Sequence, residues 1–268
     1  MGAAKPPAAG QAVLQVACEL GLPRLRVVVI TGGDVLPWMR AHDVPLIDYD
    51  LNVRNFDNTL GSANACLGDD ALLPAPVAAV IITGRVANPA LFLAPLMHHF
   101  SWQPDDWLRM AQGIAVGHLL EGAAQVSCGH LADPGYVEVP GLHEIGFPLA
   151  EVQADGGAVI TRLLGTGGGI DRLSCTAPLR YERDDLARFL QPDVVADFSD
   201  VRLQEAGPDR VQPIGANGQP QPEQSSVTFG CRGGFIGEGQ ISSVGFGARA
   251  RGHVTRSRWR FVLEDHLP

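Results

Sequence analysis

Charged and aromatic side chains are scarce in this sequence of 268 residues: charged residues make up 18% and aromatic residues 6%. Positive charge is scarcer still, because 20 lysines and arginines stand against 29 acidic residues and give a net charge of −9. Nucleic-acid binding needs a cationic surface that neutralises phosphates. We therefore expect a protein that binds a small molecule and not nucleic acid.

Targeting and membrane signals are also missing. No apolar run approaches the roughly 18 residues that span a bilayer, and the opening MGAAKPPAAG lacks the apolar core of a secretion signal. The five cysteines are odd in number and include no Cys-x-x-Cys pair, which suits a reducing compartment better than a disulfide framework. These absences predict a cytoplasmic protein without a membrane partner.

The common nucleotide and hydrolase motifs are absent too. Neither GxGxxG nor GxxxxGK[ST] occurs, so no nucleotide cofactor is indicated. GxSxG is lacking, which disfavours a serine hydrolase. HExxH and clustered Asp/His patterns are lacking as well, and we predict no metal ligands.

The first half of the chain alternates apolar runs with helical patterns. Leu25–Ile30 and Ala78–Thr83 are continuous apolar runs, which are typical of parallel strands buried on both faces. The predicted helices are Pro7–Gly21, Val35–Ala41, Ser62–Leu73, Pro89–Phe100 and Asp105–Cys128. This alternation predicts an α/β portion over residues 1–133, with a mainly parallel sheet flanked by helices.

From residue 134 onward the pattern changes to short strands separated by Gly, Pro and Asp turns. The turn at residues 154–157 predicts a hairpin. The predicted strands are Gly146–Val152, Ala158–Leu163, Asp193–Phe198, Val211–Ile214, Ser226–Cys231 and Ile241–Gly245. We expect a β-rich, α+β portion over residues 134–268, either as a second domain or as a continuation of the first.

Arg85 comes directly after the predicted strand Ala78–Thr83. Open α/β sheets bind ligands at the carboxyl ends of their strands. An arginine in this place needs either a structural carboxylate or an anionic ligand as its partner. Asn88 follows in a helix-opening position, where capping is the structural alternative. We predict that Arg85 and Asn88 bind substrate.

A line of polar side chains runs along the predicted helix Asp105–Cys128. It consists of His118, Glu121, Gln125 and Cys128. Their spacing predicts a shared helix face, and His118 and Glu121 stand one turn apart, as an acid–base pair would. A metal site with His130 and a hydrogen-bonded structural face are the alternatives. We predict that His118 and Glu121 are catalytic.

The densest glycine cluster is Gly165–Gly169. Glycines allow the backbone to approach a ligand closely, and a neighbouring hydroxyl can contact phosphate or carboxylate. A flexible connection is the structural alternative. We predict that Gly165, Thr166, Gly167 and Gly168 bind substrate.

Several longer segments resemble one protein family in content and order. They are ANACLGDDALL (63–73), ITGRVANPALFLAPLMHHFSW (82–102), GHLLEGAAQVSCGHLADP (117–134), GFPLAEVQADG (146–156), LGTGGG (164–169), LQPDVVADFSDV (190–201) and GFIGEGQIS (234–242). The chain on these grounds resembles the acyclic terpene utilisation (AtuA) family, formerly a domain of unknown function. The sequence departs from the family pattern at Asn88, where Asp is usual, and at Gly122–Ala123, where Cys-Gly is usual.

The resemblance implies a role in the breakdown of citronellol- and geraniol-type acyclic terpenes through acyl-CoA intermediates. It implies an enzyme, such as a lyase or hydratase, whose substrate is a carboxylate or a CoA thioester. The resemblance brings no catalytic residues with it, so the roles come from the residue patterns above: we predict that Arg85 and the Thr166 loop hold a carboxylate or CoA phosphate, while Glu121 or His118 moves a proton.

A non-catalytic scaffold for a pathway enzyme is the first alternative. The second is an inactive, truncated member, because the similarity begins part way into the family pattern. A sheet edge exposed in this way would favour a homo-oligomer.

Overall fold

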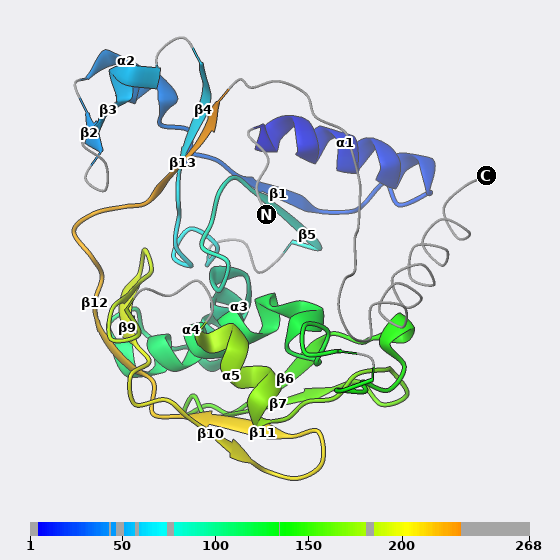
Figure 1. The fold of residues 1–268 in the computed structure, drawn as a ribbon. Coiled ribbons are helices and arrows are strands. Elements are labelled where there is room, and N and C mark those ends of the chain that lie inside the picture. The colour runs from blue at the N-terminus through cyan, green and yellow to red at the C-terminus, as the bar shows by residue number, and fades with distance from the viewer. Residues whose placement is uncertain are drawn as a thin grey trace. The chain divides into compact units, whose positions relative to one another are not determined.

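The computed structural model describes residues 5–42, 44–46, 51–56, 59–73, 78–133, 135–180 and 185–231 (Figure 1). The chain divides into two compact units. Unit 1 consists of residues 1–111, 188–196 and 218–236, and unit 2 consists of residues 112–187, 197–217 and 237–268. The boundary expected after residue 133 lies within unit 2. The expected strand Ile241–Gly245 and the segment Gly234–Ser242 lie outside the described residues.

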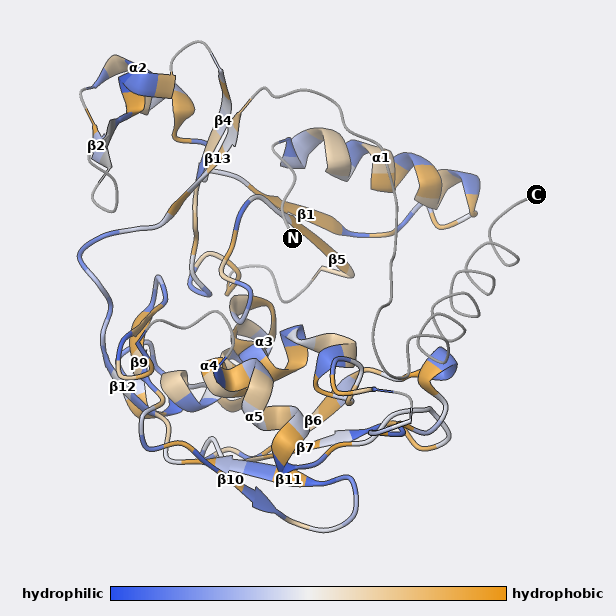
Figure 2. Ribbon diagram, viewed as in Figure 1, coloured by the Kyte–Doolittle hydropathy of each residue, from blue (hydrophilic) through white to orange (hydrophobic). Residues whose placement is uncertain are grey.

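Unit 1 contains the two apolar strands that the sequence predicts. β1 (Val27–Ile30) and β5 (Val80–Thr83) pair in parallel, with Val27 opposite Val80. Figure 2 shows hydrophobic residues along both strands. Helix α1 (Pro6–Glu19) packs on β1, and the missing side chain of Gly10 leaves room for Val29 at this contact. The parallel pairing is therefore confirmed, although it involves two strands in the part of the chain described.

A second strand pair of unit 1 is antiparallel. β4 (Leu60–Ala65) pairs with β13 (Val227–Cys231), and Ala63 lies opposite Phe229. The helix predicted at residues 62–73 is therefore wrong. The alanines of this segment favour a helix locally, but pairing with a strand far along the chain, together with burial of Leu60 and Ala63, overrides that preference.

Shorter elements complete unit 1. Helix α2 (Leu36–Ala41) and helix α3 (Ala90–Phe100) are close to their predicted bounds. The remaining elements are β2 (Pro45–Leu46), β3 (Leu51–Asn52), the 3-10 turn η1 (Val53–Phe56), β8 (Phe189–Leu190), β9 (Val194–Asp197) and β12 (Asn217–Pro220). β2 pairs with β3, and β12, β9 and β8 form a three-stranded sheet. The helices and small sheets of the described residues fit an α+β class, and the parallel β1–β5 pair supports the predicted parallel sheet only in part.

Helix α4 (Trp107–Glu121) begins in unit 1 and ends in unit 2. It is shorter than the predicted helix, which extended to Cys128. Gly122 follows its last residue, and Ala123 has a φ of 47°, a left-handed conformation that ends the helix. A separate 3-10 turn, η2 (Ala123–Gln125), comes next. The predicted polar line is therefore interrupted after Glu121.

Unit 2 is built on a four-stranded antiparallel sheet in the order β10-β11-β7-β6. The hairpin expected around residues 154–157 is confirmed, because Val152 of one strand lies opposite Ala158 of the next. The strands are β6 (Pro148–Val152), β7 (Ala158–Arg162), β10 (Arg202–Glu205) and β11 (Val211–Ile214). Helix α5 (Arg172–Arg180) and the 3-10 turn η3 (Leu142–Glu144) are the other elements.

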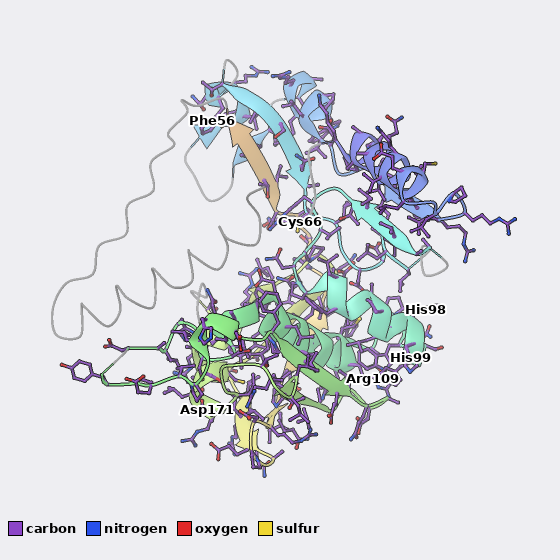
Figure 3. All side chains as sticks on the ribbon, turned by 90° about the vertical axis from the view of Figure 1, so that its right-hand side faces the viewer. Phe56, Cys66, His98, His99, Arg109 and Asp171 are labelled. Atoms are coloured by element: carbon purple, nitrogen blue, oxygen red, sulfur yellow. The ribbon has the colours of Figure 1, made fainter. Side chains whose placement is uncertain are left out.

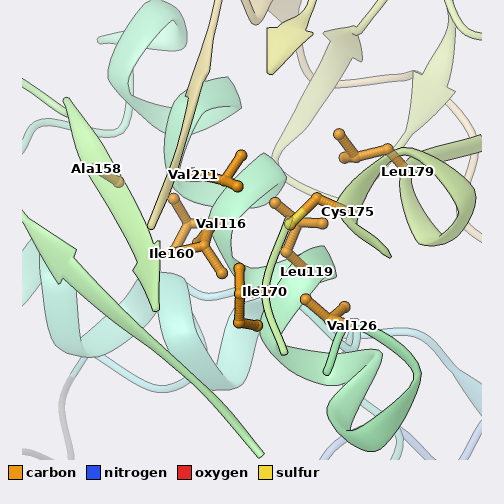
Figure 4. Close-up of a cluster of buried hydrophobic side chains, with 9 residues drawn as sticks. All are labelled: Val116, Leu119, Val126, Ala158, Ile160, Ile170, Cys175, Leu179 and Val211. Carbon is orange, nitrogen blue, oxygen red and sulfur yellow. The ribbon is translucent and has the colours of Figure 1, made fainter. Parts of the chain in front are cut away.

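A buried hydrophobic cluster joins the sheet of unit 2 to its helices (Figure 4). Leu119 of α4, Ile160 of β7 and Cys175 of α5 are each fully buried in it. Removing this much apolar surface from water is the main contribution that holds the unit together. Among the described residues, no helix is both long and apolar enough to span a membrane.

Candidate functional site

The segment that leaves β4 lies beside the segment that leaves β5. The Leu67 N–H donates to the Arg85 carbonyl at 3.0 Å, and the Ala87 N–H donates to the Leu67 carbonyl at 2.9 Å. These bonds form a parallel bridge between Leu67 and Val86. Figure 3 labels Cys66 where the chain leaves β4. The bridge brings Cys66 and Arg85 together within unit 1.

Arg85 and Cys66 are both half-buried, and the Arg85 guanidinium hydrogen-bonds the Cys66 sulfur. Burial raises the pKa of the Cys66 thiol, the charge and hydrogen bond of Arg85 lower it, and the negative charge of Asp193 raises it. The net direction is upward, so Cys66 remains a neutral thiol at pH 7. The guanidinium therefore faces a neutral group on this side.

Asp193 belongs to the turn before β9 and reaches back to the loop after β4. Its Oδ2 accepts the backbone N–H of Asp69 at 2.9 Å. A β-carbon on Gly68 would collide with the same carboxylate, so the absence of a side chain at residue 68 makes room for it. Two segments of unit 1 that are 124 residues apart in sequence thus meet at a carboxyl group.

Asp69 is 1% exposed and its carboxyl group hydrogen-bonds that of Asp193. Burial, the hydrogen bond to Asp193 and the negative charge of Asp193 together raise the pKa of Asp69 to about 9. Two carboxylates in contact do not both ionise, since their repulsion in a poorly solvated site is large. The pair therefore holds one proton at neutral pH, and burial favours Asp69 as its carrier.

The cluster of Cys66, Asp69, Arg85 and Asp193 is called the carboxyl-pair cluster below. It contains a neutral acid, a carboxylate and a guanidinium within one unit. Such a set suits proton transfer next to an oxygen that gains negative charge. The sequence pointed to Arg85 but not to the two aspartates, although GDD and QPD stand in segments that carry the family resemblance.

Asn88 also lies in unit 1, two residues before α3, and is half-buried. The cap position of that helix is taken by Pro89, and no side chain hydrogen-bonds there. The helix therefore begins one residue later than the sequence suggested. Substrate binding by Asn88 stays a prediction.

His118 and Glu121 lie in unit 2, one turn apart on α4 as predicted, but in different surroundings. His118 is 7% exposed, and its Nε2 lies 2.9 Å from the Pro178 carbonyl of α5, to which it donates. Glu121, the last residue of the helix, is exposed. The bond to α5 gives His118 a structural role in joining two helices. The catalytic role of the pair stays a prediction.

The glycine loop of unit 2 has two parts with different surroundings. Gly165 is exposed with a φ of 85°, and the Thr166 hydroxyl donates to the Leu163 carbonyl at 2.8 Å. No atom beyond its chain neighbours lies within 4 Å of where a β-carbon of Gly165 would stand. This first part is the portion of the loop that is open to a ligand.

The second part of the loop packs against other backbone of unit 2. A β-carbon on Gly167 would collide with the Gly141 carbonyl, and one on Gly168 would lie 2.5 Å from the Ser127 oxygen. Gly168 also has a φ of 89°. Internal packing therefore accounts for both glycines, and their predicted contact with substrate stays a prediction.

Arg162 fixes the ends of this loop. Its Nη1 donates to the Thr166 carbonyl at 2.6 Å, and its Nη2 donates to Asp209 Oδ2 at 2.7 Å. Asp209 Oδ1 in turn accepts the Ile170 N–H at 2.9 Å. The hydrogen bond from Arg162 lowers the pKa of Asp209. The Arg162 charge is thus neutralised by a structural acid.

The predicted site residues divide between the units: Arg85 and Asn88 belong to unit 1, and the others belong to unit 2. Within the described ranges, no group of three His, Cys, Asp or Glu side chains could hold a metal ion. His130 Nδ1 instead lies 2.8 Å from the Gln125 carbonyl. The carboxyl-pair cluster of unit 1 is therefore the strongest candidate site.

A family model described as acyclic terpene utilisation family protein AtuA matches residues 1–267. No curated protein and no solved structure matches the chain.

Proposed function

Because the chain belongs to the acyclic terpene utilisation family AtuA, we propose that it is an enzyme of acyclic terpenoid catabolism. The proposed substrate is a carboxylate or an acyl-CoA thioester, and the proposed reaction class is that of a lyase or hydratase. The odd number of cysteines and the lack of a Cys-x-x-Cys pair favour the cytoplasm as the place of this reaction.

One observation carries the proposal: Arg85, a half-buried arginine two residues after β5, and Asp193, a member of a carboxyl pair that holds a proton, both lie close enough to Cys66 to shift the pKa of its thiol. A guanidinium in partly desolvated surroundings binds a carboxylate, or the carbonyl oxygen of a thioester, through charge-assisted hydrogen bonds. Lyases and hydratases of acyl compounds also need a group that moves a proton near that oxygen. The carboxyl-pair cluster supplies both kinds of group.

Calorimetry with a free terpenoid acid and its CoA thioester tests the role of Arg85. We expect Arg85→Ala to weaken binding about 10- to 100-fold, because a hydrogen bond to a charged group contributes about 1.5–3 kcal/mol. Arg85→Lys keeps the charge but loses the paired N–H groups, so its affinity falls in between.

Arg24→Ala is the matched control, since it removes an exposed positive charge from the same unit. Equal affinities of the wild type and Arg85→Ala, with unfolding curves that agree, would remove Arg85 from the site. Failure of the wild-type chain to bind either compound would overturn the proposed function itself.

A further inference from the structure

We infer that Asp69 and Asp193 are a proton-transfer pair, in which Asp193 takes a proton from the α-carbon of an acyl thioester. The inference rests on the proposed function and assigns its proton transfer to unit 1 rather than to His118 or Glu121. Asp193 is the base, Asp69 is the positioning residue that holds the shared proton, and Arg85 faces the carbonyl oxygen.

Burial separates the roles of the two aspartates. Asp193, Cys66 and Arg85 are all half-buried, so each presents part of its surface to solvent. Asp69 is 1% exposed and shares a hydrogen bond with Asp193. A molecule entering from solvent would therefore meet Asp193 and Arg85 before it meets Asp69.

The cluster contains a buried acceptor oxygen with room in its hydrogen bonding for a water molecule. Asp69 Oδ1 is buried and has no hydrogen-bond partner among the described residues. Gln191 Oε1, two residues before Asp193, is buried and lacks a donor as well, although its Nε2 donates to the Leu190 carbonyl. Buried acceptors left without donors are costly, so such positions accommodate water or a ligand hydroxyl.

Hydrogen bonds and packing hold the Asp193 carboxylate in a fixed orientation, as a catalytic base requires. Its Oδ2 is held by the Asp69 N–H, and its carboxylate lies against Gly68. The hydrogen bond from the Asp69 carboxyl group fixes a second direction. A carboxylate held in this way loses little freedom when it meets the substrate.

The proposed step needs no additional reactant. The Cα–H bond breaks, its proton goes to Asp193, and its electron pair moves into the carbonyl to give an enolate oxygen that the Arg85 guanidinium stabilises. Return of a proton from Asp193 to the α-carbon restores the thioester. In heavy water the returned particle is a deuteron, so exchange at the α-carbon reports the step.

A purely structural role is the competing explanation, since the pair also joins two segments of unit 1. The two roles differ in a measurable way. If the pair is purely structural, substitution lowers the free energy of unfolding but leaves the deuterium-exchange rate at the α-carbon of a bound thioester unchanged. If the pair transfers a proton, substitution lowers that exchange rate while the affinity for the thioester stays the same.

The first test follows the pair itself by carbon-13 NMR of protein with labelled aspartate carboxyl groups. We expect one protonated carboxyl signal at pH 7, and its loss in Asp69→Asn but not in the exposed neighbour variant Asp70→Asn. Ionisation of both carboxyl groups at pH 7 would overturn the inference and would remove the shared proton from the support for the proposed function, whereas the binding measurements with Arg85→Ala test that function separately.

The second test measures deuterium exchange at the α-carbon of 3-methylbutanoyl-CoA by proton NMR. We expect Asp193→Asn to slow exchange about 100-fold or more, with thioester affinity within about threefold of the wild type by calorimetry. Asp70→Asn should exchange at the wild-type rate.

The outcomes separate the two proposals. Exchange at the wild-type rate in Asp193→Asn, or binding without exchange in the wild type, would overturn the inference while the proposed function stands. Absence of any thioester or carboxylate binding to the wild type would overturn both.

Discussion

Replacing Asp69 with asparagine should make the protein more stable relative to the wild type as the pH rises. Asparagine has the shape of the protonated acid and can donate an N–H to Asp193 where the acid donates its O–H. The wild type must hold a proton on Asp69 to keep the pair intact. The variant has the same uncharged group at every pH.

The magnitude follows from proton linkage. The pKa of Asp69 is raised from 3.8 to about 9 in the folded protein, so the folded state holds a proton that the unfolded chain has lost over this range. The stabilisation from the neutral acid is complete below the unfolded pKa and is lost as the pH rises toward the folded pKa. Each pH unit in that window lowers the free energy of unfolding by about 1.4 kcal/mol.

Urea unfolding followed by circular dichroism at pH 5, 6, 7 and 8 measures the effect. The quantity to compare is the free energy of unfolding of Asp69→Asn minus that of the wild type, because titrations common to both proteins cancel. We expect this difference to grow by about 4 kcal/mol between pH 5 and pH 8. Asp70→Asn is the matched control: its side chain is exposed and its charge is the smallest of the causes that raise the pKa of Asp69, so the same difference for this variant should change far less with pH.

A difference that stays flat from pH 5 to pH 8 for Asp69→Asn would refute the reasoning. It would mean that Asp69 is ionised in the folded protein at neutral pH, so the two carboxyl groups share no proton. The proton-transfer inference would fail with it.

Two further predictions concern unit 2. Gly168→Ala should destabilise the protein by about 2–4 kcal/mol, because it adds a left-handed alanine and a contact with the Ser127 carbonyl. Gly165→Ala, with positive φ but open space, should cost about 1 kcal/mol in the same thermal unfolding assay; equal losses would contradict the packing argument. Leu119→Ala should cost about 2–5 kcal/mol by urea unfolding, since Leu119 is fully buried. Leu173 is exposed, so the free energy of unfolding of Leu173→Ala should stay within about 0.5 kcal/mol of the wild-type value. A loss as large as that of Leu119→Ala would contradict the assignment of the core.

The local pattern of residues predicts those helices, strands and turns that are determined by residues close together in the sequence. The apolar runs of β1 and β5, the helix α3 and the hairpin between β6 and β7 are examples. Their burial or turn chemistry is set by residues next to one another in sequence. The predicted helix extends past the end of α4 because the polar spacing continues to Cys128, although Gly122 is a stop signal and Ala123 takes a left-handed conformation.

Long-range pairing explains what the sequence did not reveal. β4 is a strand because β13 lies beside it, and neither segment indicates the other. Asp69 looked like part of a helix, and its partner Asp193 is 124 residues away. The sequence did indicate that Arg85 needs a partner, but the hydrogen bond to Cys66 follows only from the bridge between Leu67 and Val86. A shared proton cannot be inferred before the two acids are known to meet.

The interleaved course of the chain has a practical consequence for fragments. Unit 1 draws on three separate stretches of sequence, and β4 obtains its neighbour from the last of them. Expression of residues 1–111 alone would leave β4 with a bare edge and would remove Asp193 from the backbone of Gly68. A single cut in the gene therefore cannot isolate this unit with its acid pair, and dissection has to rely on point substitutions or on a rearranged chain order.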